Sequence, residues 1–67
     1  MEEVRDCVGK LVCMVDADSG LVERITSKEQ ITAVLSVGDK IAFETNNIYT
    51  ELELIEGNIF YVNSFRN

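Results

Sequence analysis

The stretch KLVCMVDADSGLVERIT, residues 10–26, decides the fold of this 67-residue chain. Its apolar run, residues 11–15, leads into a polar segment that ends at Gly20, and a second apolar-rich segment follows over residues 21–26. An unbroken apolar run bounded by turn residues is typical of a strand that is covered on both faces. Gly20 can take the positive φ that closes a hairpin turn. We therefore expect a β-hairpin around which the rest of the chain packs.

The segment after this hairpin predicts one short helix. Ser27 and Gln30 have the spacing of a helix capping box. The apolar residues that follow have the i, i+3, i+4 spacing of one helical stripe: Ile31, Val34 and Leu35. Because this segment is rich in β-branched residues, which lower helix propensity, a strand over residues 27–35 stays open as the alternative.

The C-terminal half predicts an antiparallel meander. Its strands are expected over residues 40–45, 48–55 and 59–64. Asn46 and Asn47 fit a two-residue hairpin turn, because asparagine tolerates positive φ. We assign the second turn to the three residues 56–58, since a one-residue slip would move the whole apolar set of a strand to the wrong side.

This register divides the meander into an apolar face and a mixed face. It places Phe43 opposite Thr50 and Leu54 opposite Phe60. The apolar face then carries Ile41, Phe43, Leu52, Leu54, Phe60 and Val62. The mixed face carries Glu44, Tyr49, Glu51, Glu53, Ile55, Ile59 and Tyr61.

These elements predict one small, mainly β domain over residues 1–67, in the order β-β-α-β-β-β. Five antiparallel strands would form a single sheet that curls into a roll or an open SH3-like barrel. Residues 1–8 are expected to be a frayed lead-in, or at most one helical turn. A domain of this size buries only about 60% of the surface of its unfolded chain.

Charge and composition exclude several classes of function. The chain has 12 acidic and 6 basic residues and no histidine, so its net charge is −6. Direct binding to nucleic acid or to an anionic membrane needs a basic face and is therefore not expected. No apolar run approaches the ~20 residues of a membrane-spanning helix. The acidic start of the chain does not resemble a signal peptide, and two cysteines make no disulfide framework, so we expect a cytoplasmic protein.

We expect no catalytic, cofactor or metal site. The absence of histidine excludes Ser-His and Cys-His chemistry, and the four glycines are isolated rather than grouped in a phosphate loop. Residues 16–20, DADSG, loosely match a calcium loop, but the glycine falls one position early and Ser27 stands at position twelve. The triplet of residues 18–20 also matches aspartic proteases, which need two such carboxylates together. A dimeric aspartic protease is the enzyme alternative, although 67 residues leave little room for a substrate cleft.

The mixed face supplies the functional hypotheses. Aromatic and aliphatic side chains rimmed by charge suit a protein interface, and a chain with 46% apolar residues is too small to bury them all. The first hypothesis is a non-enzymatic acidic protein-interaction module that also self-associates. The alternative is an acidic inhibitor, of the kind carried by phages or mobile elements, that mimics nucleic acid and blocks a basic groove on a partner protein. A merely solvated face is the simpler explanation of the glutamates.

Overall fold

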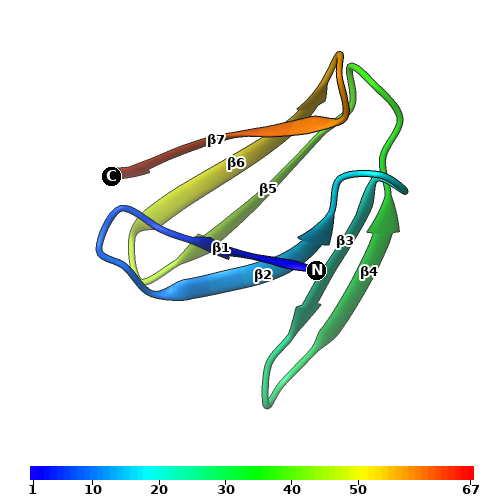
Figure 1. Cartoon of the computed structure of the whole chain (residues 1–67). Helices are drawn as coiled ribbons and strands as arrows, with labels where there is room; N and C mark the ends of the chain where they lie inside the picture. The colour runs from blue at the N-terminus through cyan, green and yellow to red at the C-terminus, as the bar shows by residue number, and fades with distance from the viewer.

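The computed structural model describes every residue, 1–67, as an all-β fold. Its seven strands are β1 (Glu2–Arg5), β2 (Leu11–Asp16), β3 (Leu21–Ile25), β4 (Gln30–Val34), β5 (Lys40–Thr45), β6 (Ile48–Ile55) and β7 (Ile59–Arg66). Strands β1 to β4 form one antiparallel sheet and β5 to β7 form another, each in sequence order. In Figure 1 the smaller sheet lies across the larger one, and residues 35–39 join them. No helix capable of crossing a membrane is present.

The predicted central hairpin is confirmed as β2 and β3. Its turn is closed by the Gly20 amide, which donates to the Asp16 carbonyl at 2.9 Å, and by the Asp18 amide, which donates to Asp16 Oδ1 at 3.1 Å. Gly20 has a φ of +78°, and its carbonyl accepts the Leu35 amide at 2.8 Å. A Cβ on Gly20 would lie 2.1 Å from the Leu35 carbonyl oxygen. Only glycine fits this contact between the turn and the end of β4.

Strand β2 is covered on both faces near its middle. The neighbouring residues Val12 and Cys13 are both buried, and successive side chains of a strand point to opposite faces. Val15 is buried too, whereas Leu11 at the start of the strand is exposed. Coverage of both faces is therefore local.

The helix predicted from residues 27–35 is wrong, because this segment forms strand β4. Its residues pair with β3 without interruption, including Arg24 with Ile31 and Val22 with Ala33. Exposure along β4 alternates, and the half-buried residues Ile31 and Ala33 face the core side. The β-branched residues of this segment favour such a strand, and pairing with β3 satisfies its backbone.

The expected capping box is also wrong, since the turn before β4 is organised by Thr26 and not by Ser27. The Thr26 hydroxyl accepts hydrogen bonds from the amides of Lys28 and Glu29 at 3.2 and 3.1 Å. The Thr26 amide donates to the Glu29 carbonyl at 2.9 Å. These bonds close a hairpin turn, a local role that threonine fills as readily as a helix cap.

The expected frayed lead-in over residues 1–8 is wrong too. Strand β1 pairs along β2, with an irregularity between Val4 and Arg5, and Val4 is buried. With β1 and β4 the chain has seven strands in two sheets, so the expected five-stranded roll or open barrel with one helix is corrected to two packed sheets.

The meander β5-β6-β7 confirms the predicted register. Phe43 pairs with Thr50, and Leu54 pairs with Phe60. Asn46 and Asn47 both have positive φ, 53° and 66°, as the two-residue turn requires. Strand β7 runs two residues further than predicted, to Arg66.

The core lies between the two sheets. Its buried cluster contains Val4, Val12, Cys13, Val15, Val22, Phe43 and Leu52. Only 11 of the 67 residues are buried, so many large apolar side chains remain on the surface. The functional question is therefore which exposed apolar groups lie together.

Candidate functional site

The side of β5-β6-β7 that is turned away from the other sheet is the strongest candidate, and we call it the outer face. Strand alternation and the observed register place all seven predicted interface residues on it. They are Glu44 from β5, Tyr49, Glu51, Glu53 and Ile55 from β6, and Ile59 and Tyr61 from β7. The same alternation adds Phe65, which the sequence analysis missed because it ended the last strand at residue 64.

Large apolar side chains on the outer face are open to solvent. Ile55, Ile59, Tyr61 and Phe65 keep 37%, 56%, 59% and 44% of their surface exposed. Neither the other sheet nor a loop covers them, since the buried cluster lies on the opposite side of this sheet. Aromatic and aliphatic groups gathered in this way are typical of protein interfaces.

Tyr49 and Phe65 form the ordered part of this face. Their ring centroids lie 5.1 Å apart at an interplanar angle of 37°. The Tyr49 hydroxyl donates to Glu51 Oε2 at 3.3 Å. Partial desolvation, together with the carboxylates of Glu51 and Glu44, raises the pKa of the Tyr49 hydroxyl, which therefore stays protonated as a donor.

The charges of the outer face are mostly negative. Lys40 is the one cation on it, and it lies opposite Glu53 in the ladder. The two salt bridges of the structure are Arg5 with Glu3 and Arg24 with Glu29, so none joins the outer-face glutamates to a cation. Glu44 does accept a hydrogen bond from the Asn67 side chain. The face thus presents carboxylates whose charge the chain does not neutralise.

A second candidate is a cleft between β2 and β3. The two strands pair only where Met14, Val15 and Asp16 meet residues 21–23. Beyond that point they separate, and a cavity of about 400 Å³ opens between them. Its lining includes Val12, Cys13, Arg24 and Ile25.

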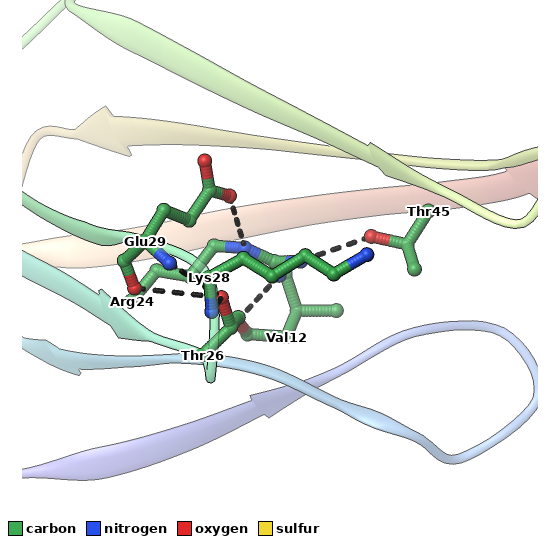
Figure 2. Close-up of polar contacts among 6 residues, drawn as sticks. All are labelled: Val12, Arg24, Thr26, Lys28, Glu29 and Thr45. Carbon is green, nitrogen blue, oxygen red and sulfur yellow. Dashed lines mark hydrogen bonds and ion pairs between the residues drawn. The ribbon is translucent and has the colours of Figure 1, made fainter.

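Arg24 lines this cavity and reaches from β3 towards Val12 and Thr45 (Figure 2). Its Nη1 donates to the Val12 carbonyl at 2.8 Å, and its Nη2 donates to Thr45 Oγ1 at 2.9 Å. Nε lies 3.6 Å from Glu29 Oε1, and the guanidinium carbon lies 5.2 Å from the centre of the Phe43 ring. The side chain is only 12% exposed. Arg24 therefore joins β3 to β2 and to the other sheet, a structural role that engages its donors within the protein.

The candidate reactive side chains of the cleft and of the β2-β3 turn are Cys13 and Asp18. Burial raises the pKa of the Cys13 thiol to about 11, against a smaller opposing effect of Arg24, so the thiol is not a nucleophile at neutral pH. Asp18 lies exposed in the turn, where its amide, and not its carboxyl group, bonds to the Asp16 carboxylate. No three His, Cys, Asp or Glu side chains lie close enough together to hold a metal ion.

Comparisons with known proteins add no assignment. No family model matches the sequence, and no similar curated protein or solved structure was found. We therefore compare the outer face and the β2-β3 cleft by their geometry alone. The outer face offers exposed apolar groups and unneutralised charge, whereas the arginine that lines the cleft already bonds within the protein.

Proposed function

We propose that this chain is a non-enzymatic protein-interaction module that binds a partner protein through the outer face. The observation that carries the proposal is the exposure of Ile55, Ile59, Tyr61 and Phe65 on one face of one sheet. A few buried aromatic and aliphatic anchors supply most of the free energy in protein interfaces, and charged residues around them set specificity.

Charge complementarity indicates the chemistry of the partner. The apolar groups are surrounded by the carboxylates of Glu44, Glu51 and Glu53, and Lys40 is the one positive charge on this face. The whole chain has a net charge of −6. These features fit a partner whose apolar patch is bordered by lysine or arginine. Stacking two outer faces of this chain would instead bring like charges together across a gap of about 10 Å.

The test compares outer-face variants with a matched control in binding to a purified partner. A partner captured with the wild-type chain is purified, and its affinity is measured by calorimetry. We expect Tyr61→Ala to weaken binding about tenfold or more, as removal of an aromatic anchor does. Val37→Ala truncates an exposed apolar residue in the linker between the sheets and should leave the affinity unchanged. Equal affinities for wild type and Tyr61→Ala would refute the proposal.

A narrower candidate is a nucleic-acid mimic, and the unneutralised carboxylates on adjacent strands favour it. Glu51 and Glu53 project from β6, and Glu44 projects beside Tyr49 from β5. In this case the partner binds nucleic acid, DNA or RNA competes with the chain, and raised salt weakens the complex strongly. The mimic would be excluded if the Glu51→Gln, Glu53→Gln double variant bound with unchanged affinity and added nucleic acid did not compete. The interaction module would then remain as the proposed function.

A further inference from the structure

The free edge of β7 has no strand paired to it, and its neighbour across a small cavity is β1, with Glu2, Glu3 and Arg5. β7 ends its sheet, runs for eight residues in unbroken register along β6, and carries no charged residue before Arg66. None of the backbone hydrogen bonds outside the strand ladders comes from residues 59–66. In an antiparallel ladder every second residue turns its N–H and C=O away from its neighbour. This edge is therefore a row of unpaired donors and acceptors of the kind that recruits a further strand.

The other sheet edges are shorter or protected. β1 carries Glu2, Glu3 and Arg5 and is interrupted by an irregularity at Val4. The β5 edge carries Lys40 and Glu44. Charges and bulges are the usual means by which edge strands avoid pairing. Strand β4 carries no charge, so its edge is the one that could compete with β7 for a second copy. It is only five residues long, against eight for β7.

We propose that two copies of this chain pair β7 with β7, antiparallel about a two-fold axis, into a continuous six-stranded sheet. The same uncharged edge serves both copies, as an isologous contact requires. A register centred on Val62 places Val62 opposite itself and Ile59 opposite Phe65 of the second copy. This register brings Ile59 and Phe65 of the outer face side by side twice along the seam and keeps Arg66 outside the overlap with β7. The added strand extends the outer face sideways and does not cover it from above, so a partner can still reach Ile55 and Tyr61 and the inference does not depend on the proposed function.

Edge pairing also separates the outer-face glutamates of the two copies. The glutamates of β6 would lie three strand spacings, about 14 Å, from those of the partner's β6. This separation exceeds the Debye length of about 8 Å at physiological ionic strength, so their repulsion is largely screened. The outer-face glutamates therefore do not oppose a second copy at this edge.

The test is the mass in solution of charge variants at the proposed axis. At about 100 μM, the wild-type chain should show twice its 7.5 kDa mass by light scattering. Val62→Lys and Val62→Glu should each be monomeric, because each opposes like charges across the axis. An equimolar mixture of the two variants should recover the dimer. Val34→Lys, the same change on the competing β4 edge, should remain dimeric.

A wild-type monomer, a dimeric Val62→Lys variant, or a mixture that stays monomeric would each overturn the inference. Loss of the dimer in Val34→Lys alone would assign pairing to β4 and overturn it as well.

Amide hydrogen exchange tests the same edge without a substitution. Every second amide of β7 should lose protection when the wild-type protein is diluted until it dissociates, and unchanged exchange would also overturn the inference. If monomeric Val62→Lys still binds the basic partner, the loss of self-pairing at β7 is independent of binding through the outer face.

Discussion

At the residue scale, Arg24 is a side chain that links β3 to β2 and to the other sheet. It bonds to β2 through the Val12 carbonyl and to β5 through Thr45, and it lies against the Phe43 ring. Its planar guanidinium reaches these partners from one position, as a lysine ammonium cannot. Sequence alone does not reveal this role, because the residues it contacts are distant along the chain and meet only after the sheets pack.

Replacing Arg24 by lysine should destabilise the fold by about 1–3 kcal/mol, the usual cost of losing hydrogen bonds to a charged group. Denaturant unfolding of Arg24→Lys measures this loss. Lys28→Ala is the control, because the exposed Lys28 side chain makes no hydrogen bond or ion pair, and it should change stability by less than about 0.5 kcal/mol. Equal stability of the two variants would contradict the assigned role.

Alanine substitutions at Gly20 and Gly38 distinguish the cost of backbone strain from the cost of a steric clash. Both have positive φ, +78° and +97°, but a Cβ at Gly38 meets nothing within 4 Å, whereas one at Gly20 meets the Leu35 carbonyl. Gly38→Ala should cost about 1–2 kcal/mol for the left-handed conformation alone. Gly20→Ala should cost at least about 2 kcal/mol more, since the clash forces the backbone to shift. Thermal unfolding of both variants measures the difference, and similar melting temperatures would show that the contact is absent.

Cys13 should make stability fall in alkaline solution. Burial raises the pKa of its thiol from 9.0 to about 11, so the folded state holds the proton more tightly than the unfolded state. Its stabilising contribution is complete below pH 9 and is lost as the pH rises towards about 11. The loss amounts to about 2–3 kcal/mol. Denaturation at several pH values should show this slope in wild type and in Cys7→Ala, and a Cys13→Ala variant should lack it. An equal slope in Cys13→Ala would place its origin elsewhere.

At the element scale, turns were the most informative part of the sequence. Asn46 and Asn47 set the register of β5 and β6, and the three-residue loop before Ile59 set that of β6 and β7. Their backbone conformations depend on local residue types, which sequence analysis can read. The same arithmetic placed the predicted interface residues on one face.

Two strands escaped prediction because their patterns are ambiguous without partners. The apolar residues of β4 fit i, i+3, i+4 spacing as well as alternation, since Ala33 between Ile31 and Leu35 is weakly apolar. β1 contains one buried residue, Val4, and no periodicity can be read from one position. In both cases pairing with a neighbouring strand decided the conformation.

The turn before β4 supplies a test at this scale. Thr26→Ala removes the hydroxyl that accepts the amides of Lys28 and Glu29 and should cost about 1 kcal/mol. Ser27→Ala should be nearly neutral, because the Ser27 side chain is exposed and makes no hydrogen bond in the structure. Urea unfolding of the two variants distinguishes them. A larger loss in Ser27→Ala would instead support the capping box and a helix.

At the scale of the whole molecule, the chain combines a small core with two distinct exposed surfaces. The outer face presents apolar groups with glutamates, and the β7 edge presents backbone groups without charge. The sequence predicted most of the outer face, because its residues follow from local register. It predicted neither the β7 edge nor the Arg24 cleft, since both depend on which strands lack neighbours in the final sheets.

NMR mapping of the interface, with the captured partner bound, shows whether this molecule binds through its outer face. Partner binding should perturb the signals of Ile59, Tyr61 and Phe65, because these exposed side chains become buried. Signals of Arg24 and Ile25 in the β2-β3 cleft should remain unchanged. Perturbed signals in the cleft alone, with those of the outer face unchanged, would show that the partner binds elsewhere than the outer face.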